Sequence, residues 1–337
     1  MNRKSRFHYS DDSGPPVQAS SNLEATEHRD DSKDGRRDRD ASNSRGGEDD
    51  ATVLCRGLRK RFESLEAVAG LDLRVDRGEI FGLVGPDGAG KTTTFRMLSG
   101  LLAPDDGWAR VDGHPIEAGR RAGPALKDSI GYMPQRFGLY FDLSVEENMR
   151  FYADLFELEE KAWSERGRRL LEMTRLQEFL SRPAGKLSGG MKQKLGLTCA
   201  LLHEPRVLLL DEPTNGVDPV SRREFWRILS ELTGQNITVL MATAYLDEAE
   251  RCDRVGLMYK GRLVACDRPD RLRRSLASPE DQELPSMEDT FIALVRQQDA
   301  QVEDGSDQNT AHSQQGAQGS QEPKPERPDL KQAGEDS

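Results

Sequence analysis

Apolar side chains are concentrated in the middle of this chain and are nearly absent from both of its ends. The first fifty residues, and the stretch from about 301 onward, are polar and mix both charge signs. Such segments cannot bury enough apolar surface to offset the conformational entropy that ordering removes. We therefore expect disordered residues over 1–50, one folded domain over 51–299, and a disordered tail or linker over 300–337.

Within the folded region, short apolar runs alternate with helical patterns. The runs at 79–84, 206–211 and 236–242 are predicted strands, and the stretch at 93–102 has the apolar spacing of a helix that packs on a sheet. The region 143–185 is rich in helical pattern. It opens with a plausible capping box, in which a Ser is followed three residues later by a Glu.

Charge and cysteine content narrow the function classes. The net charge of −11 and the pI near 5.2 argue against a general nucleic-acid-binding protein. No run approaches the roughly 20 apolar residues that span a bilayer, and the N-terminus lacks the features of a signal or transit peptide. The four cysteines lie far apart without a CxxC pair, so we expect reduced cytosolic thiols and no zinc site.

A glycine-rich loop directly follows the predicted strand at 79–84. Its sequence at 85–92 is GPDGAGKT, which in a strand–loop–helix context predicts a P-loop. Backbone N–H groups of such a loop surround phosphate oxygens. Lys91 would reach the β- and γ-phosphates, and the Thr92 hydroxyl would ligate Mg²⁺. A tight turn without a ligand is the alternative interpretation. The predicted nucleotide contacts in this loop are Gly85, Pro86, Asp87, Gly88, Ala89, Gly90, Lys91, Thr92 and Thr93.

Two further motifs narrow the class of nucleotide-binding protein. LSGGMKQK at 187–194 precedes the apolar stretch RVLLLDEPTNGVDP at 206–219. With the P-loop ahead of them, these motifs resemble the ATPase subunits of ABC transporters. The family signature LSGGQ precedes a Walker B strand that ends in Asp-Glu and leads into a D-loop. The resemblance covers residues 52–297, and the order of the motifs makes it specific.

The resemblance implies a role for each motif residue. Ser188, Gly189 and Gly190 would contact the γ-phosphate bound to the opposite subunit, so that two domains enclose two ATP molecules. Asp211 would hold Mg²⁺ directly or through water. Glu212 would be the general base that orients or deprotonates the attacking water.

Two residues outside these motifs also match family positions. Gln135, in IGYMPQ, matches the Q-loop glutamine that senses Mg²⁺ and water, so it joins Lys91 and Glu212 as a predicted catalytic residue. With Thr92 and Asp211 it is also a predicted Mg²⁺ contact. Phe62 lies where the family stacks an aromatic ring on adenine, although core packing is the ordinary role of a lone Phe.

The chain departs from the family pattern at the switch histidine. That residue is expected just after the strand at 236–242, where this chain has Ala244, and none of its five histidines falls nearby. Losing one preorganised hydrogen-bond donor costs about 3 kcal/mol, or roughly 10²–10³ in rate. In one hypothesis the chain is half of an asymmetric pair in which one ATP site turns over slowly. In the other, Glu212 and the remaining ligands suffice for slow hydrolysis.

From these residues and the resemblance we expect an α/β P-loop NTPase fold. It would have a mainly parallel core sheet, an antiparallel β subdomain (52–76 and parts of 107–118) and a helical subdomain. The surface of the helical subdomain would receive the membrane subunits, although packing only on its own domain is the alternative.

The implied function is ATP binding and hydrolysis that powers transport. The implied partners are a second ABC ATPase domain, in a homo- or heterodimer, and integral membrane permease subunits, with no nucleic acid. The chain would be cytoplasmic and peripheral on the inner face of the cell membrane. The segment 284–295 resembles the short C-terminal element of exporter ATPases, in particular those paired with ABC-2-type permeases, which export drugs, lipids or polysaccharides. This element and the absence of the switch histidine together also resemble the first half of tandem ATPases. In that case the polar tail after residue 300 would be a linker to a second ATPase domain.

Two other functions stay open from the sequence. One is a catalytically weakened regulatory subunit paired with a competent ATPase, motivated by Ala244 and opposed by Glu212. The other is a non-transport ABC ATPase acting on ribosomes or DNA. Those proteins usually carry two ATPase domains or long coiled-coil insertions, and neither is visible here.

Overall fold

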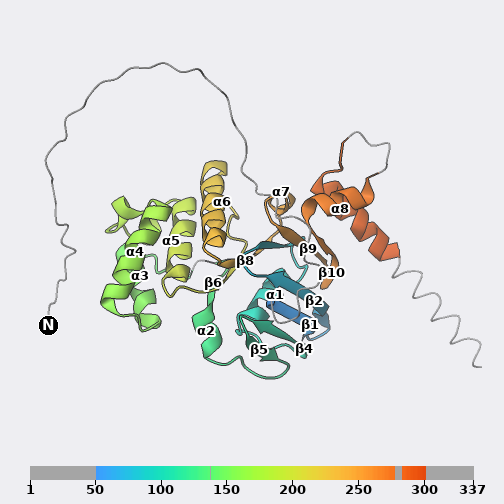
Figure 1. Cartoon of the computed structure of the whole chain (residues 1–337), viewed down its shortest axis with the longest axis horizontal. Coiled ribbons are helices and arrows are strands. Elements are labelled where there is room, and N and C mark those ends of the chain that lie inside the picture. The colour runs from blue at the N-terminus through green and yellow to red at the C-terminus, as the bar shows by residue number, and fades with distance from the viewer. Residues whose placement is uncertain (1–50, 137, 278–282, 301–337) are drawn as a thin grey trace, which may run out of the picture. The chain divides into compact units, whose positions relative to one another are not determined.

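A computed structural model describes residues 51–136, 138–277 and 283–300 of the chain (Figure 1). The predicted disordered segments, 1–50 and the part of the C-terminal one beyond residue 300, lie outside the described residues. The strands are β1 (Ala51–Phe62), β2 (Leu65–Asp76), β3 (Ile80–Val84), β4 (Asp106–Val111), β5 (His114–Glu117), β6 (Ile130–Met133), β7 (Val207–Asp211), β8 (Thr238–Thr243), β9 (Arg254–Tyr259) and β10 (Arg262–Asp267).

The helices of the described residues separate and cover these strands. They are α1 (Lys91–Leu98), α2 (Ala125–Ser129), α3 (Val145–Leu155), α4 (Glu160–Thr174), α5 (Gly189–Leu201), α6 (Pro219–Gly234), α7 (Leu246–Ala249) and α8 (Pro269–Leu276), with short 3₁₀ turns η2 (Gln177–Phe179) and η3 (Ala184–Lys186). Residues 287–300 are also helical. Within these residues, no helix is long and apolar enough to cross a membrane.

The central sheet has six strands in the order β10-β9-β3-β8-β7-β6. All neighbours from β9 to β6 run parallel, and β10 alone pairs antiparallel, with β9. β3, β7 and β8 are buried along their whole length, which their almost continuous apolar sequences require. The predicted mainly parallel core sheet is therefore confirmed.

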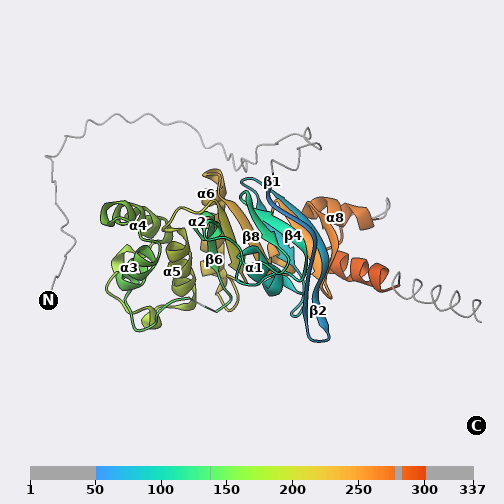
Figure 2. The ribbon, with the colours of Figure 1, turned by 90° about the horizontal axis from the view of Figure 1, so that it is seen from below.

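A second, antiparallel sheet has the order β2-β1-β4-β5. Helix α1 lies between the two sheets in Figure 2, and its side chains Phe95, Met97 and Leu98 are buried in a core that both sheets share. The helix that follows the glycine-rich loop is thus held on both sides. The predicted antiparallel β subdomain is confirmed.

Helices α3, α4 and α5 form a separate cluster with its own apolar core (Figures 1 and 2). The predicted capping box begins α3, because Ser144 accepts a hydrogen bond from the Glu147 N–H and Glu147 accepts one from Ser144. Helix α5 also packs on the central sheet through Leu197 and Ala200. It therefore links this cluster to the sheet, and the predicted helical subdomain is confirmed.

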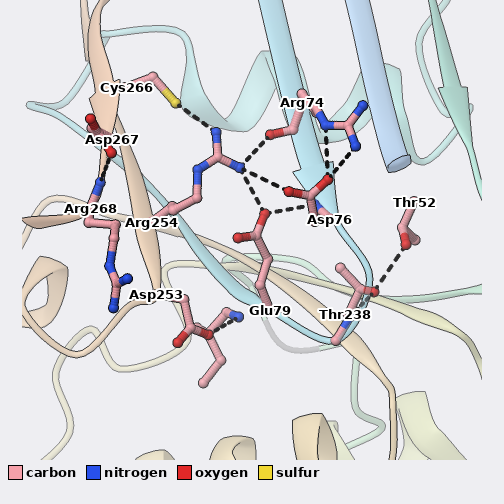
Figure 3. Close-up of polar contacts among 12 residues, drawn as sticks. Thr52, Arg74, Asp76, Glu79, Thr238, Asp253, Arg254, Cys266, Asp267 and Arg268 are labelled. Atoms are coloured by element: carbon pink, nitrogen blue, oxygen red, sulfur yellow. Dashed lines mark hydrogen bonds and ion pairs between the residues drawn. The ribbon is translucent and has the colours of Figure 1, made fainter. Parts of the chain in front are cut away.

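A polar cluster closes the N-terminal end of β3 (Figure 3). The Arg254 guanidinium donates to a Glu79 carboxylate oxygen and to the Arg74 carbonyl oxygen, each over 3.1 Å. The Asp253 carboxylate accepts from the Ile80 N–H over 2.8 Å. These bonds tie β2 and β9 to the start of β3, so the antiparallel sheet is fixed to the central one.

Candidate functional site

The parallel strands bring the predicted site residues to one edge of the central sheet. Their carboxyl ends lie side by side in paired registers, with Val84 opposite Thr243 and Asp211 opposite Ala242. The loop after β3 and the loop after β7 both attach to β8. The Gly85 N–H donates to the Thr243 carbonyl over 3.2 Å, and the Glu212 N–H donates to the Ala242 carbonyl over 2.9 Å. This edge is where open α/β sheets bind ligands.

The glycine-rich loop needs glycine at two positions for steric reasons. A Cβ atom on Gly85 would lie 2.1 Å from the Met258 carbonyl oxygen of β9. Gly90 has a φ of +107°, and a Cβ there would lie 2.3 Å from the Ala67 carbonyl oxygen of β2. The loop is thus packed against both sheets, and its backbone passes where no side chain fits.

Lys91 begins α1 directly after the loop, and its side chain is only 4% exposed. Its ammonium donates to the carbonyl oxygens of Gly85 and Pro86, over 2.7 and 3.0 Å. The nearest acid is Glu212, 3.7 Å away. Burial lowers the pKa of Lys91, while the Glu212 charge opposes that shift. Lys91 is therefore a buried cation held against the loop where phosphate would bind.

Asp211 and Thr92 have the features of a magnesium site. The Thr92 hydroxyl donates to Asp211 Oδ1 over 3.0 Å, and Oδ2 of this buried carboxylate has no hydrogen-bond partner among the described residues. Within the same residues, no group of three or more His, Cys, Asp or Glu side chains could hold a metal by itself. A single carboxylate and a hydroxyl suit Mg²⁺, which usually takes its other ligands from water and substrate phosphates. The donor set therefore fits.

Glu212 lies at the centre of a hydrogen-bonded group. The amides of Gln135 and Asn215 both donate to its Oε2 atom, over 2.7 and 3.3 Å. Glu212 has a φ of +51°, in the left-handed region that non-glycine residues rarely adopt and that often marks functional sites. The structure thus brings together Gln135, Glu212 and Lys91, the three predicted catalytic residues.

The predicted signature residues open helix α5 but lie apart from the phosphate loop of the same chain. Ser188 is exposed and caps the helix, accepting a hydrogen bond from the Met191 N–H over 3.3 Å. Gly190 packs against α6, where an added Cβ would lie 2.4 Å from the Ser221 side chain. Figures 1 and 2 both separate α5 from α1. The predicted role of Ser188, Gly189 and Gly190 on a neighbouring subunit's nucleotide stays a prediction.

Phe62 ends β1 at the turn into β2, and 44% of it is exposed. It is not a core residue, which removes the ordinary alternative for a lone Phe. The Lys60 ammonium lies 5.8 Å from the centre of its ring. An exposed ring on the hairpin that packs against the loop can stack on a base, and that role stays a prediction.

Ala244 and its neighbours follow β8 at the same edge. Ala244 is exposed and has no polar side-chain atom, and the next residue, Tyr245, donates its hydroxyl to Asn215 over 3.2 Å. Asn215 in turn contacts Glu212. Neither Asn215 nor Tyr245 is predicted as an individual site residue from the sequence.

The buried acid Glu248 is another residue of this edge that the sequence does not predict. Its carboxylate accepts hydrogen bonds from the hydroxyls of Thr214 and Thr243, over 2.5 and 2.7 Å. These bonds join the loop after β7 to the end of β8. The local signal is a group of three acids, Asp247, Glu248 and Glu250, which does not distinguish the buried one from the two exposed ones.

Comparison with known proteins agrees with this geometry. A family model described as "ABC transporter" matches residues 68–215. The probable multidrug ABC transporter ATP-binding protein YbhF of Escherichia coli is 53% identical over 231 residues, which are 68% of this chain and 39% of that protein. The Nod factor export ATP-binding protein I of Burkholderia lata is 39% identical over 226 residues, covering 67% of this chain and 73% of that protein.

A solved structure of an ATP binding subunit of an ABC transporter is also similar. Its TM-score is 0.63 at 30% sequence identity, with 72% of this chain and 99% of that chain covered. This chain spans about two fifths of the length of YbhF.

Proposed function

Because the chain belongs to the family of ABC transporter ATP-binding subunits, we propose that it binds and hydrolyses ATP to power export through a separate membrane permease. One observation carries the proposal. The carboxyl ends of three neighbouring strands bring a buried lysine, an aspartate with a free oxygen and a glutamate held by two amides to one edge.

The proposed reaction divides roles among these residues. A water molecule attacks the γ-phosphorus, the bond to the bridging oxygen breaks, and ADP and phosphate are released. Glu212 orients the water and accepts its proton, and Gln135 and Asn215 hold the carboxylate. Lys91 neutralises phosphate charge.

Thr92 and Asp211 would hold Mg²⁺, which when bound would neutralise developing charge on the phosphate oxygens. The loop residues 85–93 and Phe62 would bind the rest of the nucleotide.

The second half of each ATP site would come from another ATPase domain. Ser188 is exposed where it caps the start of α5, and an exposed helix start suits an anion. We propose a head-to-tail dimer, homo- or heteromeric, in which this helix start covers the partner's ATP. With the permease it would lie at the cytoplasmic face of the cell membrane. The name of one relative refers to multidrug transport and that of another to Nod factor export. We extend to this chain only the direction, export.

The test compares Lys91→Ala and Glu212→Gln with the wild type. We expect Lys91→Ala to lose Mg·ATP binding, because no cation remains beside the loop. We expect Glu212→Gln to bind ATP but to release phosphate at least about 10²-fold more slowly. Lys161→Ala and Glu250→Gln, which change exposed residues, are the matched controls.

Each alternative gives a different result in this test. Unchanged ATP binding by Lys91→Ala would overturn the nucleotide site. Equal background phosphate release by the wild type and Glu212→Gln would leave a binding subunit without hydrolysis. Size measurements of Glu212→Gln in saturating ATP test the dimer, and a monomer there would overturn it.

A further inference from the structure

Tyr245, the residue after Ala244, is connected to Glu212 through one residue, Asn215. The Tyr245 hydroxyl donates to Asn215 Oδ1, and the same amide donates through Nδ2 to Glu212 Oε2. The amide oxygen of Asn215 thus accepts one hydrogen bond and its nitrogen donates another, which fixes the orientation of the side chain. Its nitrogen is turned towards the carboxylate because its oxygen is held by the tyrosine.

Besides its hydroxyl, Tyr245 is held at its backbone and at its ring. Its N–H donates to the Thr243 hydroxyl over 3.0 Å, which in turn donates to the buried Glu248. The Arg222 guanidinium lies 4.7 Å from the centre of the Tyr245 ring. A side chain fixed at its backbone and at its ring can direct its hydroxyl, even though 36% of the residue is exposed.

The frame around Tyr245 connects the two strands that carry it and Glu212. Glu248 accepts from Thr214 in the loop after β7 and from Thr243 at the end of β8. Arg222 of α6 lies 3.7 Å from the same carboxylate. Glu248 therefore links the loop that carries Asn215 to the end of β8 that leads to Tyr245.

We propose that Tyr245 is a positioning residue for ATP hydrolysis, holding Glu212 in place through Asn215. The inference rests on the proposed function, because it assigns Glu212 the role of base. Ala244 supplies no donor at the switch position, and the tyrosine hydroxyl next to it orients the base from the side. The orientation costs nothing at the moment of reaction, since the bonds are already formed.

The experiment is a double-mutant cycle in the full chain. Tyr245→Phe, Asn215→Ala and the double variant are compared with the wild type in steady-state Mg·ATP hydrolysis and in ATP binding. Tyr245→Phe keeps the ring that Arg222 contacts and removes only the hydroxyl. Tyr259→Phe, in β9, is the matched control.

We expect Tyr245→Phe to lower kcat about threefold to tenfold, the loss that one hydrogen bond supports, with KM and the ATP Kd unchanged. In the Asn215→Ala background the same change should have no further effect on kcat, because the amide that links Tyr245 to Glu212 is already absent. Independent effects that multiply, a change confined to KM, or an unchanged kcat would overturn the role of Tyr245. Wild-type phosphate release that does not depend on Glu212 would instead overturn the proposed function, and this proposal with it.

Discussion

The Gln135 amide donates a hydrogen bond to a Glu212 carboxylate oxygen over 2.7 Å. Gln135 follows β6, and the chain then continues into the helical cluster of α3, α4 and α5. Glu212 follows β7, which pairs with β6 in the central sheet. A movement of the helical cluster that pulled on Gln135 would therefore remove one of the two amides that hold the proposed base.

Restoring a histidine at the switch position should speed hydrolysis. Ala244→His adds a donor at the exposed end of β8, and one preorganised donor is worth roughly 10²–10³ in rate where the geometry is ideal. We expect an increase of at least about tenfold in phosphate release per molecule. Ala244→Leu, which adds bulk without a donor, is the control. If the His and Leu variants behave alike, the absence of a histidine at position 244 does not limit hydrolysis.

Asp211 should determine how far Mg²⁺ strengthens ATP binding. Its Oδ2 atom is buried and has no hydrogen-bond partner among the described residues, so it is free to bind the cation. We expect Asp211→Asn to bind ATP in EDTA as the wild type does. The increase in ATP affinity that Mg²⁺ produces should be about 10–100-fold smaller in the variant. Asp142→Asn, at an exposed position, serves as the comparison. Titrations with and without EDTA measure both quantities, and an undiminished gain would exclude Asp211 as a ligand.

Removing the Glu248 carboxylate should destabilise the fold. The side chain is fully buried, and its loss leaves the Thr214 and Thr243 hydroxyls without their acceptor. We expect Glu248→Ala to lower the free energy of unfolding by about 2–4 kcal/mol. Glu250→Ala, at a position whose side chain is 48% exposed, should cost less than about 1 kcal/mol. Urea denaturation of both variants provides the measurement, and equal losses would contradict the buried role of Glu248.

The polar cluster of Figure 3 should make stability depend on pH. Burial raises the pKa of Glu79 from 4.5 to about 7, although the Asp76 N–H and Arg254 favour its ionised form. The folded protein therefore binds this proton more tightly than the unfolded chain. As the pH rises from 4.5 to about 7, the contribution of Glu79 to the free energy of unfolding falls by up to about 3 kcal/mol.

Glu79→Gln removes this titration while keeping a side chain of similar size. We expect the stability of the wild type relative to Glu79→Gln to fall as the pH rises from 4.5 to about 7, as urea denaturation measures it. The exposed Glu165→Gln should show no such trend. A difference between the wild type and Glu79→Gln that stays constant with pH would show that the ion pair with Arg254 keeps Glu79 charged throughout.

The sequence predicted the parts of the fold that depend on local pattern. β3, β7 and β8 are buried on both faces, so their apolar runs are continuous and easily recognised. The glycine-rich loop was recognised because steric limits require its glycines at fixed spacing. The confirmed capping box at Ser144 likewise depends on residues only three positions apart.

Contacts between distant residues could not be predicted in this way. Tyr245 meets Asn215 across 30 positions of sequence, and Glu248 meets Thr214 across 34. Both pairs form only because β8 lies beside β7 in parallel register, and strand order is not visible in an apolar run. The same limit hid the carbonyl partners of Lys91, which depend on the path of the loop.

β8 lies between β3, which leads to the glycine-rich loop, and β7, which leads to Glu212. The carbonyl of Thr243 accepts from Gly85 in the loop, and the carbonyl of Ala242 accepts from Glu212. A single residue inserted into β8 would shift these two carbonyls by about 3.3 Å along the strand and turn the side chains after it to the opposite face. The N–H groups of Gly85 and Glu212 would then lose their acceptors together. The length of β8 is thus under a much stricter limit than the turn that precedes it at 235–237, where added residues would extend into solvent.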